Sequence, residues 1–317
     1  MLFDLDTMRI YIHTYLDTKL RNLLLAGLSE EYSVVFREED DSDEVAFTKC
    51  QKAQLILGNV PAEWAVDTQE LVFWQLDSAG FDKYKGTQLD AKVANMGDWF
   101  ARPCAETIVG GIMAMYRGID TLTLLKQKSE WVGHALRPSL RLLDRQNVVI
   151  LGSGTIGSAT REILSGFRCD VKTLARTSPE AELHSREDLL AELANTDVVI
   201  NTLPGTADRY VDEEFILAMK PGSVYANVGR GNTTDEEALM ESLHSGHLSG
   251  AVLDVTDLEP LPADNPLWKM PNVILTQHTG GGQAKEDVGK VQLFLRNVQN
   301  LKAEHPIESE VDLKRGY

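Results

Sequence analysis

Residues 147–157 read Asn-Val-Val-Ile-Leu-Gly-Ser-Gly-Thr-Ile-Gly, an apolar run that leads directly into a glycine-rich turn. The apolar run 148–151 predicts a buried parallel strand, and residues 158–164 predict the helix that follows it. The three glycines between them have the spacing of a dinucleotide-binding turn. Gly152 permits the tight turn, Gly154 lets the backbone approach a pyrophosphate, and Gly157 allows close packing of helix on strand. A diphosphate would lie on free N–H groups at the positive end of the helix.

Short β-branched runs continue this rhythm through the second half of the chain, with helical stretches between several of them. The predicted strands cover residues 171–174, 198–202, 224–228, 251–255 and 273–276. Such alternation predicts an α/β fold with a doubly wound parallel sheet, the Rossmann arrangement. One intervening helix is predicted to begin at the capping box Thr234-Asp-Glu-Glu237 and to end at Gly246.

A second, smaller α/β domain is expected before the glycine turn, because a chain of 317 residues favours two domains. Its predicted strands cover residues 8–13, 53–57 and 71–75. Apolar residues at three- and four-residue spacing predict a connecting helix over 105–127 and a final helix over 284–303, which would return the chain to the first domain. We therefore expect a discontinuous substrate domain, 1–100 plus 285–317, and a dinucleotide-binding domain, 101–284.

Composition narrows the classes of partner. With 31 Lys plus Arg against 48 Asp plus Glu, the net charge of −17 argues against nucleic acid and anionic membranes as partners. No apolar run approaches the roughly 18 residues that span a bilayer, and the first ten residues lack a cationic leader, so a cytoplasmic protein is expected. The three cysteines are far apart and predict neither disulfides nor a metal site. The acidic run 37–44 predicts a solvated loop, with a partner-binding tail as the alternative.

Three groups at predicted strand ends could supply chemistry. In open α/β sheets ligands bind outside the carboxyl ends of strands, where Arg230, Asp254 with Glu259, and His278 all fall. Taken singly, each has a structural explanation: a surface ion pair for Arg230, a rigid proline-rich loop for Glu259, and a hydrogen-bonded loop residue for His278. Together, a guanidinium, a carboxylate and an imidazole beside a dinucleotide turn favour hydride transfer to a carboxylated carbonyl.

These stretches, in this order, resemble the D-isomer-specific 2-hydroxyacid dehydrogenase family over most of the chain. The stretches concerned are Asp77-Ser-Ala-Gly80, Gly152-Ser-Gly-Thr-Ile-Gly157, Thr202-Leu-Pro-Gly-Thr206 through Met219-Lys-Pro-Gly222, Asn227-Val-Gly-Arg-Gly231, Leu253-Asp-Val through Glu259-Pro260, and His278-Thr-Gly-Gly281. The resemblance implies a flavodoxin-like substrate domain into which the nucleotide domain is inserted, and a homodimer.

The resemblance also implies a role for each candidate residue. Arg230 would bind the substrate carboxylate and polarise the keto oxygen, His278 would pass the proton, and Glu259 would orient the imidazole and stabilise its charge. Backbone N–H groups of Ala79 and Gly80 would hold the carboxylate from the other domain.

Cofactor contacts are implied at the matching motif positions. Asp254 would meet the nicotinamide carboxamide. The other implied cofactor contacts are Gly152, Ser153, Gly154, Thr155, Ile156, Gly157, Thr202, Leu203, Pro204, Val228, Gly229, His278 and Gly280.

Two positions depart from the family pattern. Gln277 stands where proline usually precedes the catalytic histidine, and Thr256 stands where an aromatic residue is common. Both departures concern the shape of the substrate pocket and remove no catalytic group. Formate-using relatives have glutamine in place of the glutamate present here as Glu259, which disfavours that activity.

The end of the second predicted strand bears on cofactor choice. An NAD enzyme of this fold has an acidic residue there for the ribose diol, but this chain has Ala175 followed by Arg176, Thr177 and Ser178. Asp170 comes too early in the strand. A guanidinium and hydroxyls would bind a 2′-phosphate, so NADP(H) is predicted, with NAD(H) as the weaker alternative. Arg176 stacked on adenine is the competing interpretation.

The sequence therefore predicts an NADP(H)-preferring oxidoreductase that reduces a small 2-keto acid, with glyoxylate and hydroxypyruvate as first candidates, to the (R)-2-hydroxy acid. The alternative is a nucleotide-sensing, corepressor-like interaction protein of the same fold. The complete set of Arg230, Glu259 and His278 weighs against that alternative.

Overall fold

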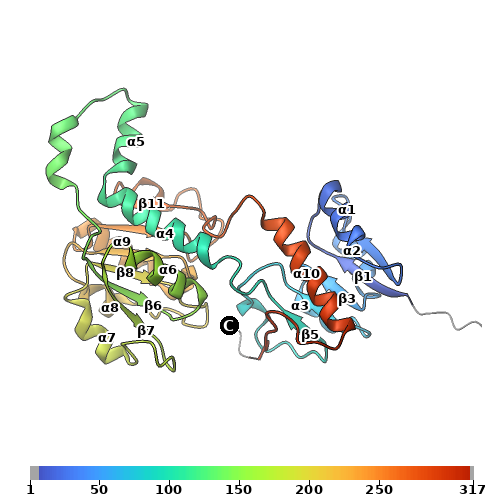
Figure 1. Ribbon diagram of the computed structural model, residues 1–317. Helices are drawn as coiled ribbons and strands as arrows, with labels where there is room; N and C mark the ends of the chain where they lie inside the picture. The colour runs from blue at the N-terminus through green and yellow to red at the C-terminus, as the bar shows by residue number, and fades with distance from the viewer. Residues whose placement is uncertain (1–6, 315–317) are drawn as a thin grey trace, which may run out of the picture. The chain divides into compact units, whose positions relative to one another are not determined.

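The computed structural model describes residues 7–314, and these form two compact units (Figure 1). Residues 7–99 and 283–314 make up the first unit, and residues 100–282 make up the second. Each unit is built on its own parallel sheet, which confirms the predicted α/β fold class.

The second unit contains a six-stranded sheet in the order β11-β10-β9-β8-β6-β7, with every neighbouring pair parallel. Its strands are β6 (Asn147–Leu151), β7 (Asp170–Leu174), β8 (Val198–Asn201), β9 (Val224–Asn227), β10 (Gly250–Leu253) and β11 (Val273–Leu275). Its helices are α4 (Ala101–Tyr116), α5 (Ile119–Gln127), α6 (Thr155–Ser165), α7 (Arg186–Leu193), α8 (Glu213–Ala218) and α9 (Glu236–Ser245), with short 3-10 helices at Gly133–Ser139, Gly231–Thr233 and Pro266–Lys269. The strand order reverses between β6 and β8, so the predicted doubly wound sheet is confirmed.

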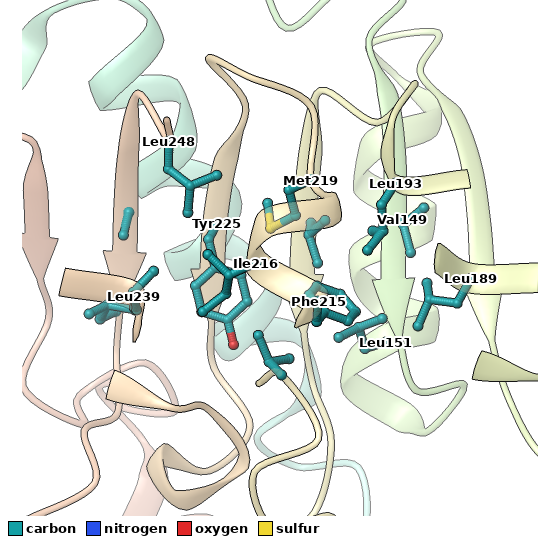
Figure 2. Close-up of a cluster of buried hydrophobic side chains, with 14 of the residues drawn as sticks. Val149, Leu151, Leu189, Leu193, Phe215, Ile216, Met219, Tyr225, Leu239 and Leu248 are labelled. Atoms are coloured by element: carbon teal, nitrogen blue, oxygen red, sulfur yellow. The ribbon is translucent and has the colours of Figure 1, made fainter. Parts of the chain in front are cut away.

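Both faces of this sheet are buried, which explains why its strands are continuous apolar runs. Along β6, Val149 and Leu151 belong to one hydrophobic cluster, and Val148 and Ile150 belong to another on the opposite face. Side chains of α7, α8 and α9 complete the first cluster, which Figure 2 shows in close-up. Side chains of α4 and α6 complete the second.

The first unit has five parallel strands in the order β2-β1-β3-β4-β5, the flavodoxin-like order. The strands are β1 (Met8–Ile12), β2 (Tyr32–Phe36), β3 (Leu55–Leu57), β4 (Phe73–Gln75) and β5 (Lys92–Ala94). The helices are α1 (Thr18–Ala26), α2 (Asp43–Cys50), α3 (Ala62–Val66) and α10 (Glu286–Lys302), with a 3-10 turn at Asp82–Tyr84. Helix α10 contributes Val291, Phe294 and Val298 to a cluster that also contains residues of β1 and α1.

Two strands, β2 and β5, were not predicted. Both lie at the edges of the sheet, where one side of a strand has no neighbour. Strand β2 has no fully buried residue and β5 has only three residues, so neither produces a strong apolar run.

The prediction of one continuous helix over 105–127 is wrong. The segment forms two helices, α4 and α5, that meet at 70°. The break is at Gly118, whose φ of 63° is left-handed and stops the helical hydrogen-bond ladder. Among the described residues no single helix is long and apolar enough to cross a membrane, and α4 with α5 meet the length and composition test only as this bent pair.

The predicted capping box is also wrong, by one residue. Asp235 caps α9, because its Oδ1 accepts from the backbone N–H of Ala238 at 3.1 Å. Thr234 is buried instead, and its hydroxyl bonds to the Tyr225 hydroxyl and to Asn227. Gly246 ends the helix with a φ of 77°, as predicted.

The acidic run 37–44 is only partly the solvated loop that we expected. Its last two residues begin α2, with Ser42 as the N-cap. The Asp41 carboxylate lies 2.6 Å from the ammonium of Lys49, and its side chain is only 9% exposed. These contacts fix the run against the first unit.

A matched pair of substitutions tests how α4 packs on the sheet. A Cβ added at Gly110 would have no heavy atom within 4 Å, whereas a Cβ at Gly111 would overlap Val252 Cγ1 in β10. Because alanine is more stable than glycine in a helix, Gly110→Ala should raise the free energy of unfolding by about 0.5–1 kcal/mol. Gly111→Ala should lower it by about 1–3 kcal/mol, since the packed core must move. Urea unfolding measures both, and equal stability of the two variants would contradict this packing.

Candidate active site

The glycine turn lies at the point where the strand order of the second unit reverses. Gly152 has a φ of 105°, and a Cβ there would lie 2.8 Å from Thr202 Oγ1. A Cβ at Gly157 would collide with the Gly152 carbonyl oxygen, so α6 packs directly on the turn. Gly154, in contrast, faces open space, and no side chain caps the N-terminus of α6. The turn therefore fits a dinucleotide, whose diphosphate can approach Gly154 and accept from the uncapped N–H groups.

Two buried asparagines, which the sequence analysis missed, hold the neighbouring loops. Asn201 ends β8 and its Oδ1 accepts from the N–H of Leu203 at 2.9 Å, while Asn227 ends β9 and accepts from the N–H of Gly229 at 3.0 Å. Both are turns in which an asparagine side chain bonds the backbone two residues on. An asparagine at the last position of two successive strands is the signal that could have identified them. These turns fix the loops that carry the predicted cofactor contacts Thr202 to Pro204, Val228 and Gly229.

Arg230 is half-buried directly after this turn. Its carbonyl accepts from Asn227 Nδ2 at 3.1 Å and from the Thr233 hydroxyl at 2.6 Å, so its backbone is held on both sides. A Cβ at Gly231 would overlap the Thr256 carbonyl. The loop after β9 therefore lies against the loop after β10, which leads to Glu259.

Asp254 is buried, with 4% of its surface exposed, and it organises the loop after β11. Its Oδ1 accepts from the Thr276 hydroxyl at 2.5 Å, from the N–H of Thr279 at 3.1 Å and from the N–H of Gly280 at 3.0 Å. Its backbone carbonyl accepts from the N–H of His278 at 2.5 Å. Asp254 therefore positions His278, a role that the sequence analysis did not assign to it.

His278 and Glu259 are in direct contact, with 2.5 Å between Nδ1 and Oε2. The other carboxylate oxygen of Glu259 accepts from the N–H of Thr256 at 3.1 Å. Since a carboxylate only accepts, Nδ1 carries the proton and Nε2 is the nitrogen left for proton exchange. His278 and Gln277 have φ values of 55° and 54°, a strained conformation that is often concentrated at functional sites.

The carboxyl end of β7 presents Arg176 and Thr177 to solvent, with Ser178 half-buried, while Asp170 begins the strand at its other end. The structure also brings residues 182–184 beside β7, through a bridge between Leu174 and Leu183. No pattern in the sequence indicated this neighbour. Glu182 there is engaged through both oxygens by Arg161, which holds its pKa down at about 2.

The remaining predicted substrate residues, Ala79 and Gly80, follow β4 in the first unit. The Ala79 carbonyl accepts from Asn95 Nδ2 at 2.5 Å, and the Gly80 carbonyl accepts from the Ser78 hydroxyl at 2.8 Å. These bonds hold the loop within its own unit.

The charges of Asp254 and Arg230 both act on the thiol of Cys104 in α4. Burial, and then Asp254, raise the pKa of its thiol to about 12, so the thiol is neutral and is no nucleophile. Among residues 7–314 there is no group of three or more His, Cys, Asp or Glu side chains arranged to hold a metal ion.

Comparisons with family models, curated proteins and solved structures all indicate the same family. Residues 109–280 match the family model of the D-isomer specific 2-hydroxyacid dehydrogenase NAD-binding domain. The chain is 33% identical to glyoxylate/hydroxypyruvate reductase A of Klebsiella pneumoniae (strain 342) over 222 residues, which are 68% of this chain and 69% of that protein.

Solved structures agree. A crystal structure of a D-isomer specific 2-hydroxyacid dehydrogenase family protein from Aeromonas salmonicida matches with a TM-score of 0.82 at 25% identity, over 97% of this chain and 99% of that one. An NADPH-dependent glyoxylate/hydroxypyruvate reductase from Sinorhizobium meliloti, in complex with NADP and sulfate, shares the fold with a TM-score of 0.79 at 21% identity, over 98% and 100% of the two chains.

The second unit is thus the NAD(P)-binding Rossmann domain of an oxidoreductase. The glycine turn, the ordered loops after β9 and β10, and the histidine after β11 occupy the unit that the family model matches. The resemblance drawn from the sequence is confirmed, and the chain belongs to the D-isomer-specific 2-hydroxyacid dehydrogenase family.

Proposed function

We propose that this protein reduces a small 2-keto acid, of the size of glyoxylate or hydroxypyruvate, to the (R)-2-hydroxy acid with NADPH. The observation that carries the proposal is the 2.5 Å contact between His278 Nδ1 and Glu259 Oε2. This contact fixes a proton on Nδ1 and leaves Nε2 for proton exchange. The imidazole follows a strand in the same sheet as the strand that precedes Arg230. The name of the Klebsiella relative supports the choice of keto acid. The similarities give no support to the alternative of a nucleotide-sensing interaction protein.

The bound nicotinamide would supply the hydride that the keto carbon accepts. In our proposal the Arg230 guanidinium grips the substrate carboxylate and polarises the keto oxygen. His278 then donates the Nε2 proton to that oxygen, and Glu259 stabilises the imidazolium before transfer and holds its orientation. N–H groups of Ala79 and Gly80 would bind the carboxylate as well, and Asp254 would meet the nicotinamide carboxamide.

The preference for NADP(H) rests on the groups at the end of β7. Arg176, Thr177 and Ser178 offer a cation and hydroxyls to a 2′-phosphate. Glu182, which the bridge between Leu174 and Leu183 brings beside β7, already has both oxygens on Arg161, so it is poorly placed to bind a ribose diol. NAD(H) would bind more weakly, without the phosphate contact.

We also propose that the protein is a homodimer that associates through α5 and the segment after it. Figure 1 shows this segment extending away from the sheet of the second unit. Helix α5 buries no residue, and Trp131 is 96% exposed. We call residues 119–142 the arm. Its other large exposed apolar side chains are Ile119, Leu122, Leu124, Val132 and Leu142. An apolar surface of this kind is typical of an interface, and a second copy of the chain is the partner that the family implies.

Replacement of the proton donor tests the mechanism. His278→Ala should lower turnover of glyoxylate or hydroxypyruvate by about 100- to 10,000-fold, the usual effect of a positioned acid, while the Kd for NADPH changes little. Glu259→Gln should be milder, because it removes support rather than the proton. His244→Ala, at an exposed site in α9, is the control. If His278→Ala retains more than a third of wild-type turnover, His278 is not the acid.

Cofactor choice is tested at the end of β7. A charge-assisted hydrogen bond is worth about 1.5–3 kcal/mol, so Arg176→Ala should lower kcat/KM for NADPH by about 10- to 150-fold. The same variant should leave NADH kinetics within a few-fold, since NADH has no 2′-phosphate. Adding Ala175→Asp should turn the preference toward NADH. Arg145→Ala, at an exposed site, is the control. Equal weakening of both cofactors would instead indicate that Arg176 stacks on adenine.

Introducing a negative charge into the arm tests the proposed dimer. Trp131→Glu and Leu124→Glu should convert a species of twice the 35.2 kDa chain mass into a monomer in sedimentation velocity, because a carboxylate would be buried in the interface. Leu217→Glu, at an apolar site on α8 that is about as exposed as Leu124, should leave the mass unchanged. A wild-type protein that sediments as a monomer at micromolar concentration would refute the proposal.

A further inference from the structure

A cavity of about 360 Å³ lies at the carboxyl ends of the strands of the first unit. Its wall includes His13, which follows β1, Arg37, which follows β2, and Asn59, which follows β3. The strand order reverses between β1 and β3, and this is the position where open α/β sheets bind ligands. The volume is also within the range of small-molecule sites.

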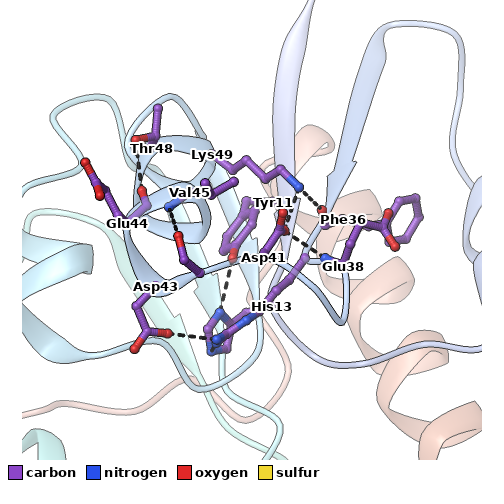
Figure 3. Close-up of polar contacts among 12 residues, drawn as sticks. Tyr11, His13, Phe36, Glu38, Asp41, Asp43, Glu44, Val45, Thr48 and Lys49 are labelled. Carbon is purple, nitrogen blue, oxygen red and sulfur yellow. Dashed lines mark hydrogen bonds and ion pairs between the residues drawn. The ribbon is translucent and has the colours of Figure 1, made fainter.

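Arg37 is held in place by two partners. Its Nη1 lies 3.0 Å from His13 Nε2, and its Nη2 donates to Asp43 Oδ1 at 2.8 Å. A guanidinium can only donate, so His13 Nε2 must carry a lone pair and its proton must be on Nδ1, 3.2 Å from the Tyr11 hydroxyl. Figure 3 shows Tyr11, His13 and Asp43, with a dashed line between the Tyr11 hydroxyl and the His13 ring. Burial, and then Arg37, lower the pKa of His13 to about 4, so the imidazole orients Arg37 without adding charge.

Arg37 shares the cavity wall with two carboxylates, Asp43 and Glu63, both on exposed residues. Asp43, its one ion-pair partner in the described chain, has a side chain that is 81% exposed, so water screens that pair. The guanidinium has more N–H groups than these two partners use. Lys83 adds a second cation to the wall, and its ammonium lies 4.8 Å from the centre of the Tyr84 ring.

Beside Glu63, part of the wall is apolar. Trp64 is nearly buried and meets the His13 ring edge-on, with centroids 5.7 Å apart. Val60, Pro61 and Tyr84 complete this surface. A planar fork of donors beside aromatic walls matches a planar organic anion better than a tetrahedral one. We propose that this cavity is a second ligand site, which binds a small organic carboxylate through Arg37 and Lys83, residues that are not part of the site built on Arg230.

Asn59 connects this cavity to the loop that follows β4. Its Oδ1 accepts from the N–H of Asp77 at 3.3 Å and from the Ser78 hydroxyl at 3.4 Å. The Thr14 hydroxyl, next to His13, donates to Asp77 Oδ2 at 2.8 Å. A carboxylate in the cavity therefore acts on the loop that carries Ala79 and Gly80. Its effect on the KM of the keto acid rests on the proposed function, whereas its binding does not.

Malonate, which has no keto group to reduce, is a suitable probe in isothermal titration calorimetry at fixed ionic strength. We expect malonate to bind to the full-length Arg230→Ala variant, in which the other carboxylate site is disabled. Adding Arg37→Gln should weaken this binding by about tenfold or more, the effect of one charge-assisted bond. Lys83→Gln, at an exposed position, should weaken it as well. Arg21→Gln is the matched control, because Arg21 lies in the same unit, pairs with Glu38 and does not line the cavity.

The outcomes separate the two sites. Loss of all malonate binding in Arg230→Ala, or unchanged affinity in both the Arg37→Gln and Lys83→Gln variants, would overturn the second site. Inorganic phosphate that binds more tightly than malonate, with the same dependence on Arg37, would overturn its assignment to carboxylates. A protein that binds malonate through Arg37 but reduces no keto acid would refute the proposed function and leave the second site standing.

Discussion

The buried carboxylate of Asp254 is the contact on which the candidate active site depends. A carboxylate with 4% exposure must be satisfied by donors, and the donors here are the Thr276 hydroxyl and two backbone N–H groups of the loop after β11. Together with the bond from the His278 N–H to the Asp254 carbonyl, these contacts force that loop to turn back over β10. The imidazole is thereby brought to Glu259, which also follows β10. The end of β10 thus positions both His278 and Glu259.

The parallel sheet brings the loops of the candidate active site together. Because all six strands of the second unit run in the same direction, the loops that carry Arg230, Glu259 and His278 leave neighbouring strands at the same edge. Asn201 and Asn227 then fix two of these edge loops by the same local device, a side-chain bond to the backbone two residues on. Rigid loops on a rigid sheet are what positioned proton transfer and carboxylate binding require.

The first unit repeats the principle with different groups. Its charged residue, Arg37, is also fixed at a strand end, but by a neutral imidazole rather than a carboxylate. In the second unit the imidazole is paired with Glu259, whereas in the first unit burial, and then Arg37, lower the pKa of the His13 imidazole. In our proposal His278 donates a proton, whereas the neutral ring of His13 holds the Arg37 cation in place.

The fold class, the dinucleotide turn and the family could be predicted from the sequence, because buried parallel strands are continuous apolar runs and the glycine spacing is set by local backbone geometry. The sequence also predicted Arg230, Glu259 and His278 as site residues, since each lies in a loop that follows a strand. The sequence did not reveal the edge strands β2 and β5, the bend at Gly118 or the one-residue shift of the α9 cap, where local patterns are weak or nearly equivalent.

Which distant groups are in contact could be seen only in the folded structure. The bonds of Asp254 to the His278 loop, the pairing of Glu182 with Arg161 beside β7, and the grip of His13 and Asp43 on Arg37 join segments that the chain keeps apart. Spacing along a sequence carries information about neighbours on one helix or strand. Contacts between loops depend on how strands are ordered in the sheet, and that order is set by the packing of the whole unit.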